Sequence, residues 1–233
     1  LPAVNLKETD TDYAIELALN KTGASGSKDP QDPPLNDVSG SIDNASIAIY
    51  GIKSGSIEVL RGVDGNFTAD AGDLNTSISL QGKNATGSIS NWNVNVCALS
   101  ATSMKVAENL GGTFFARAAT DFSAGATAQI AVGSTDKVGA NIAFLNNKIA
   151  VIGINVDNLT VGGAISSQIT AYASYLFASS NSGSNKLAGA TIQNNNVTVA
   201  GILGKNIITG SGISSNITVY GEMGVVSQGY FNW

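Results

Sequence analysis

The chain has no histidine and a single cysteine, Cys97, in 233 residues. Without histidine, Ser-His-Asp and Cys-His types of nucleophilic catalysis are excluded. One cysteine cannot form an intramolecular disulfide, and a zinc site built from several Cys and His ligands is also excluded. Cys97 lies in "NWNVNVCALS", on the opposite strand face from Val94 and Val96, so we expect an inert thiol. No motif indicates a reaction, and we expect no enzyme.

Charged residues are also scarce, at 12% of the chain, and the net charge is −5 with a pI near 4.6. Twelve Lys and Arg residues are too few to neutralise a phosphate backbone, so we do not expect nucleic acid as a partner. No apolar run reaches the ~18 residues of a membrane-spanning helix. The sequence begins at Leu1, which is typical of a secreted protein after signal-peptide removal, although a shortened sequence would look the same.

What the sequence contains is a series of short alternating apolar segments separated by Gly and Asn. Examples are "ASIAIYGI" (45–52), "NIAFLNNKIAVIGINV" (141–156) and "NITVYGEMGVV" (216–226). Such runs predict β-strands, and turns at Asn146 and Asn147 and near Gly204 indicate tight hairpins. The sequence therefore predicts an all-β fold, an antiparallel β-sandwich of the jelly-roll type. The segment "ALSATSMKVAENLGG" (98–112) alone predicts a helix, ending at Gly111.

A weak internal similarity provides an alternative fold. Segments starting at Asn44, Asn147, Asn196 and Asn216 share Asn, alternating β-branched residues and Gly. A strict period would predict a β-solenoid, but these spacings are irregular. A β-barrel is the other alternative, suggested by the aromatic ending at Trp233.

The N-terminal region separates from the rest by composition. We expect an N-terminal arm at 1–20, a tether rich in Gly and Pro at 21–40, and one β-rich body at 41–233. The arm alternates apolar and polar residues and predicts a strand. Its apolar positions are Tyr13, Ile15, Leu17 and Leu19.

A strand on a polar tether suits donation into an open sheet edge of another subunit, where alternate side chains fill pockets. In its arm, tether and nearly neutral body, the chain resembles extracellular filament subunits assembled by donor-strand complementation, such as TasA-like fibres and archaeal bundling pili and threads. The resemblance implies a secreted subunit of a pilus, fibre or biofilm matrix that polymerises head to tail with copies of itself through the four apolar arm positions. The alternatives are a monomeric secreted adhesin or carbohydrate-binding β-domain, and an outer-membrane-associated barrel protein.

Two further sets of residues are candidate sites. In "VDGNFTADAGDL", Asp64, Asn66, Asp70 and Asp73 supply oxygen ligands at a spacing that suits Ca²⁺. The segment does not match the helix-loop-helix calcium motif, so an acidic turn between strands is the favoured explanation and calcium the alternative. We expect no other cofactor. Asn-x-Ser/Thr sequons are candidate N-glycosylation sites, and surface glycans or cell-surface molecules are candidate partners. The sequons are at Asn20, Asn44, Asn66, Asn75, Asn84, Asn158, Asn196 and Asn216.

Overall fold

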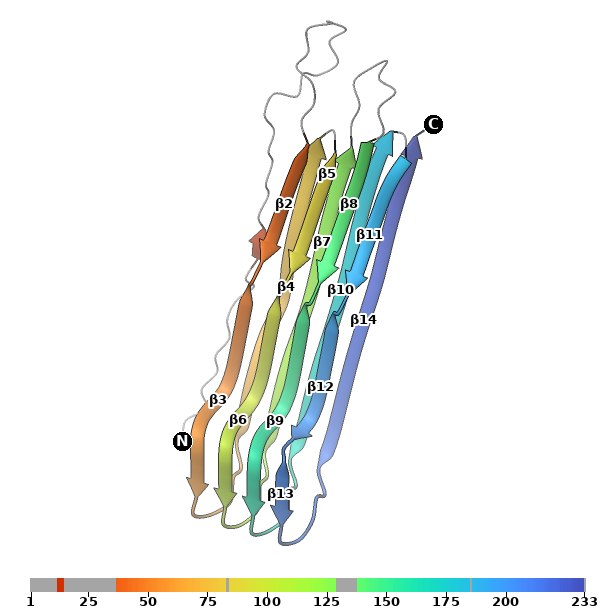
Figure 1. Cartoon of the computed structure of the whole chain (residues 1–233). Helices are drawn as coiled ribbons and strands as arrows, with labels where there is room; N and C mark the ends of the chain where they lie inside the picture. Colours follow the sequence, from red (N-terminus) through yellow and green to blue (C-terminus); the bar gives the residue numbers. More distant parts are fainter. Residues whose placement is uncertain (1–11, 15–36, 83, 129–137, 185, 233) are drawn as a thin grey trace, which may run out of the picture.

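The computed structural model describes residues 12–14, 37–82, 84–128, 138–184 and 186–232. Every regular element in these ranges is a β-strand, and every strand pairing between them is parallel. No helix in the described ranges is long and apolar enough to cross a membrane. The chain winds into a flat solenoid, in which successive coils lie side by side (Figure 1).

The first three coils each contribute one strand to each of three sheets, and the last coil contributes two strands to one of them (Figure 1). The upper front sheet contains β2 (Val38–Asp43), β5 (Ala85–Ser90), β8 (Val138–Leu145) and β11 (Lys186–Gln193). The lower front sheet contains β3 (Ser46–Val59), β6 (Asn93–Val106), β9 (Lys148–Val161), β12 (Asn196–Leu203) and β13 (Asn206–Thr209). The back sheet contains β1 (Asp12–Ala14), β4 (Asn66–Gly82), β7 (Thr113–Ala128), β10 (Gln168–Ser184) and β14 (Asn216–Asn232).

The expectation of an antiparallel β-sandwich is wrong, because the strands pair in parallel with equivalent strands of neighbouring coils. The solenoid alternative is compatible with this arrangement. Buried parallel strands usually have continuous apolar runs, whereas alternation is typical of antiparallel sheets with one wet face. Here each sheet also has one face against the other layer and one face in solvent. β4 illustrates this, since its burial alternates from Leu74 to Gly82.

The two predicted hairpins are wrong, because in neither case do the flanking strands pair with each other. One is a corner between two sheets, and the other is a break within one layer of a coil. Asn146 and Asn147 separate β8 from β9, which belong to different sheets. Gly204 lies between β12 and β13, and both of these strands pair in parallel with β9. Asn and Gly mark positions where the backbone turns, but they do not determine whether the flanking strands pair with each other.

The predicted helix at 98–112 is also wrong, because β6 continues to Val106 and a turn follows. The strand buries Ala98, Leu99 and Ala101 and then Met104 and Val106. The positions that face the interior therefore change from even to odd and back to even residue numbers along the strand. A strand with such irregularities places apolar residues at spacings of three, which imitate a helix.

A row of left-handed asparagines forms the corner between the two front sheets. Asn44, Asn91, Asn146 and Asn194 have φ values of 61°, 56°, 56° and 56°. Asn adopts this conformation more readily than most residues with a Cβ, so the corner recurs at Asn in every coil. Nδ2 of Asn194 donates to Oδ1 of Asn146 at 3.2 Å, which links successive corners.

The interior between the layers is apolar and includes a chain of aromatic contacts. Phe122 packs edge-on against Trp92, with ring centroids 5.4 Å apart, and against Tyr175 at 5.0 Å. Phe177 then contacts Phe144 at 5.0 Å. These rings come from the front and back layers of adjacent coils, so they hold the layers together as well as the coils.

Candidate functional site

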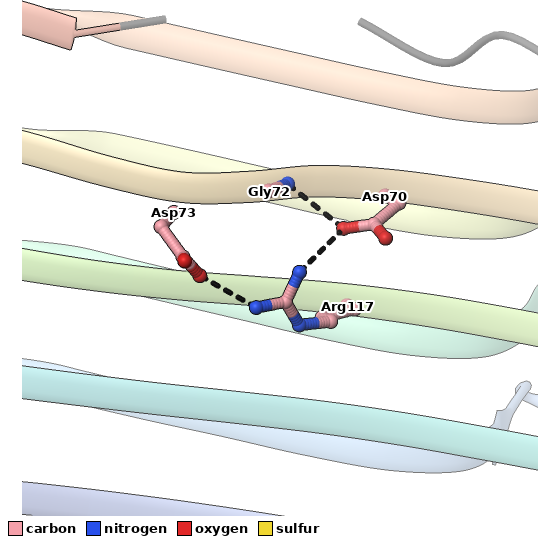
Figure 2. Close-up of polar contacts among 4 residues, drawn as sticks. All are labelled: Asp70, Gly72, Asp73 and Arg117. Atoms are coloured by element: carbon pink, nitrogen blue, oxygen red, sulfur yellow. Dashed lines mark hydrogen bonds and ion pairs between the residues drawn. The ribbon is translucent and has the colours of Figure 1, made fainter. Parts of the chain in front are cut away.

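The acidic segment of the sequence lies at the start of the back sheet. Asp64 precedes β4, Asn66 is its first residue, and Asp70 and Asp73 flank a register shift in the pairing with β7. Figure 2 shows Arg117 of β7 between the last two carboxylates. Its Nη1 lies 3.4 Å from Oδ1 of Asp70, and its Nη2 lies 2.5 Å from Oδ1 of Asp73.

The structure thus brings together Asp70 and Asp73, two of the four expected calcium ligands. The guanidinium group of Arg117 lies between their carboxylates. The backbone N–H of Gly72 donates to Oδ1 of Asp70 at 2.8 Å and fixes the bulge (Figure 2). Asn66 is about 13 Å from Asp70 along an extended strand that rises about 3.3 Å per residue. Within the described ranges, no group of three or more His, Cys, Asp or Glu residues could hold a metal ion. Calcium binding stays a prediction from the sequence.

Cys97 lies in β6 and is fully buried. Its Sγ donates to the carbonyl of Leu99 at 3.0 Å. Burial raises the pKa of this thiol to about 12, against smaller opposing effects from backbone hydrogen bonds. A thiol that stays protonated and enclosed at neutral pH is neither a nucleophile nor a metal ligand.

Most candidate glycosylation asparagines in the described ranges are exposed. The exposed ones are Asn44, Asn66, Asn75, Asn158, Asn196 and Asn216. Asn84 is half-buried and already uses both ends of its amide: Nδ2 donates to Oδ1 of Asp37 and Oδ1 accepts from the N–H of Gly139, both at 2.8 Å. Asn20 lies outside the described residues.

Two hollows in the described part of the molecule lie at the two ends of the solenoid. A hollow of about 370 Å³ lies at the first coil, bordered by Ile42 and Ile47 and by Thr76 and Trp92. Another of about 350 Å³ lies at the last coil, between Val197 and Val199 of β12 and Met223 of β14. Both hollows lie between the front layer and the back layer, and inward-facing apolar side chains form part of their walls.

The last coil exposes the residues that point into the solenoid. Ile217, Val219, Met223 and Val225 of β14 are 45%, 47%, 53% and 53% exposed. Their register partners on β10, one coil earlier, are at most 1% exposed. We call these four residues the C-terminal overhang. It forms because no described strand pairs with the far edge of β14.

The first coil has the complementary arrangement. Inward residues of β3, such as Ile47, Ile49 and Ile57, are half-buried, whereas those of β4 behind them are buried. The front layer therefore projects at the first coil and the back layer at the last. β1 pairs in parallel with β4 over three residues, with Tyr13 opposite Thr76.

The interaction residues expected in the N-terminal arm lie only partly within the described residues. Tyr13 lies in β1, whereas Ile15, Leu17 and Leu19 lie outside the described residues. The C-terminal overhang was missed. Its sequence has the alternating pattern of an ordinary strand, like the covered strands of the other coils, so local sequence does not distinguish it.

Comparison with known proteins identifies no relative: no family model matches the chain, and no curated protein or solved structure matches it significantly.

Proposed function

We propose that the chain is a structural subunit of an extracellular filament, in which copies stack end to end through the first and last coils of the solenoid. The observation that carries the proposal is the C-terminal overhang. Its four inward apolar side chains are about half exposed and form an apolar strip along β14. The backbone edge of β14 can also pair with a strand of another chain.

The size of the end supports a stable contact. A strand of 17 residues such as β14 extends over about 55 Å, and two packed layers measure about 20 Å across. One end of the solenoid thus offers roughly 1,100 Å² per partner, more than the ~800 Å² per partner of a standard stable interface. The backbone groups on the edge of β14 add a long row of unpaired donors and acceptors.

Both ends differ, so stacking is heterologous. A head-to-tail contact between unlike surfaces produces an open filament unless the rotation closes a ring. Among the exposed asparagine sequons, Asn158 lies on β9, away from the first and last coils. It would stay accessible to glycosylation in a secreted filament.

Electron microscopy and sedimentation of the purified chain over a range of concentrations test the proposal. Val219→Lys places a charge in the overhang and should abolish filaments while the monomer stays folded, because Val219 is already half exposed. Thr218→Lys, the neighbouring outward position, is the matched control and should still assemble. A chain that stays monomeric at every concentration would exclude this function.

Donation of the N-terminal strand is a second way to build the same filament. β1 pairs with β4 of its own chain, and β4 of a neighbour offers the same edge. Deletion of residues 1–20 separates the two modes, because donation requires the arm and stacking of coils does not.

A further inference from the structure

We infer that the contact between copies is a direct continuation of the solenoid, in which β14 of one copy replaces β1 on the β4 edge of the next copy. The inference rests on the proposed function and specifies its interface: the partner is a second copy, the register is fixed, and β1 has to leave.

The register follows from residues that pair with one another from coil to coil. We call each such series of paired residues a column. Ile217 pairs with Ile169, Ile169 with Phe114, and Phe114 with Phe67. One more step of the same kind places Ile217 of one copy beside Phe67 of the next. Phe67 already stacks on Phe114 with centroids 4.7 Å apart, so its other ring face would meet Ile217.

The other inward columns continue with compatible side chains. In the same register, Val219 meets Ala69 and Met223 meets Leu74, both apolar partners on β4. In the lower front sheet, the Val197 and Ile207 columns continue to Ile47 and Ile57. Apolar residues therefore meet in both layers, and no inward charge would be buried in these columns.

The staggered ends fit together in space. The back layer projects at the last coil and the front layer projects at the first, so each overhang would cover the inward face of the other. The two hollows, of about 370 and 350 Å³, would then lie in the interior of a continuous stack.

On the outer face, the register brings Glu222 beside Asp73. This like-charge contact is offset, because Nη2 of Arg117 lies 2.5 Å from the Asp73 carboxylate. The hydroxyl of Tyr220 also donates to Glu222 at 2.7 Å. The ion pair shown in Figure 2 thus leaves the acidic edge of β4 able to accept a second acidic strand.

β1 occupies part of this edge. It pairs with Asn75, Thr76 and Ser77, which are the positions that β14 of a neighbour would need in order to pair along its whole length. Three residue pairs compete with a ladder of 17 residues, so the longer strand should displace β1. β1 therefore limits the rate of assembly rather than its extent.

Cysteine cross-linking in a Cys97→Ala background tests the register. Thr68 and Thr218 fall opposite one another across the inferred contact, about 4.8 Å apart, a spacing at which a disulfide can form. The Thr68→Cys/Thr218→Cys variant should form covalent oligomers under oxidation. Ser77→Cys/Thr218→Cys is the control, because those positions are roughly 30 Å apart in the inferred register.

The displacement of β1 has its own test. Ala14 pairs with Ser77, so an oxidised Ala14→Cys/Ser77→Cys variant should retain β1 on β4 and fail to form filaments until the disulfide is reduced. Deletion of residues 1–14 should shorten the lag of assembly several-fold. Direct continuation of four coils further predicts an axial rise of about 19 Å per subunit in the filament, from strand spacings of about 4.8 Å.

The outcomes separate the inference from the proposed function. A chain that never assembles overturns both. Filaments that cross-link through Ser77→Cys/Thr218→Cys, or through neither pair, overturn the register alone. Filaments that disappear when residues 1–14 are deleted would establish strand donation instead and overturn the displacement of β1.

Discussion

The side-chain amide of Asn147 donates to Oδ1 of Asn195, the residue that follows it by one coil, at 2.9 Å. Asn147 is fully buried. Its Nδ2 also donates to the carbonyl of Ile89 at 3.1 Å, and its Oδ1 accepts from the N–H of Trp92 at 3.0 Å. One side chain thus joins three successive coils at the corner between the front sheets.

Replacement of this side chain should destabilise the whole stack. Asn147→Ala removes the partners of a buried N–H and a buried carbonyl, each worth ~1–3 kcal/mol, so we expect a loss of about 2–4 kcal/mol in the free energy of unfolding. Urea unfolding followed by circular dichroism measures the loss. Asn196→Ala, at an exposed neighbour, is the control and should cost well under ~1 kcal/mol. Equal effects of both variants would contradict the bridging role of Asn147.

Gly153 should not tolerate a methyl group. A Cβ at this position would meet Cγ2 of Ile169 across the layer and would lie 2.7 Å from the carbonyl oxygen of Gly201 in the next coil. Gly153→Ala should therefore cost about 1–3 kcal/mol through overpacking. Gly55→Ala is the matched control, since a Cβ there meets nothing within 4 Å, and its thermal midpoint should be unchanged or higher. An unaffected midpoint in Gly153→Ala would show that the layers can separate at low cost.

The Cys97 thiol should make stability fall at alkaline pH. The unfolded thiol ionises around its usual pKa of 9.0, whereas burial raises the folded pKa to about 12. Between these values the unfolded state loses a proton that the folded state keeps, so its contribution is intact below pH 9 and decreases as pH rises toward 12.

The measurement compares the native chain with Cys97→Ala, because lysines and tyrosines also titrate in this range. The stability difference between the two chains should shift by about 1.4 kcal/mol against the native chain from pH 8 to pH 10. A constant difference would mean that the thiol is accessible to water in the folded state. In that case a maleimide reagent should also label Cys97 without denaturant.

Removal of the Tyr175 hydroxyl should stabilise the protein. This hydroxyl is buried in the core and has no hydrogen-bond partner among the residues that the structure describes, and burial raises its pKa. Tyr175→Phe keeps the ring contacts with Phe122 and Phe177 and removes an unsatisfied polar group. We expect a gain of about 1 kcal/mol in urea unfolding. A loss of stability instead would indicate a water molecule that bonds the hydroxyl.

The strand content could be predicted from the sequence, but the pairing could not. Three of the segments compared for internal similarity do lie beside one another in the lower front sheet, where Ile47, Ile149 and Val197 share one register position. The equivalent segment of the second coil, with Val94 at that position, was missed because "NVNVCAL" lacks the glycine. The fourth segment compared, at Asn216, belongs to the back sheet.

Unequal coil lengths hid the period as well. Equivalent residues are 47 apart between the first two coils, as in the bond from Asn84 to Asp37, and 48 apart between the last two, as in the bond from Asn194 to Asn146. Between the second and third coils the separation is 55, as in the bond from Gly139 to Asn84. A single longer coil is enough to make a regular stack look irregular in sequence.

The candidate site could not be predicted for a different reason. Val219 and Ala171 both occupy inward positions of the back sheet, and local sequence gives both the same alternating pattern. They differ only in which coil they belong to: Val219 is 47% exposed and Ala171 is 0% exposed. Exposure at the end of a stack depends on the order of coils, which short-range patterns do not contain.

The parallel pairing of every coil also has a mechanical meaning. The backbone bonds of β10 and β14 point along the stacking direction over 17 residues, and those of the front sheets point the same way. Tension along that direction would load a whole row of bonds together rather than opening them one at a time. Within one copy, the chain itself also crosses from the front sheets to the back sheet in every coil, so the layers cannot part without unwinding coils. The contact between copies has no such covalent crossing. A stretched filament of this chain should therefore resist extension well and, when it breaks, release whole subunits.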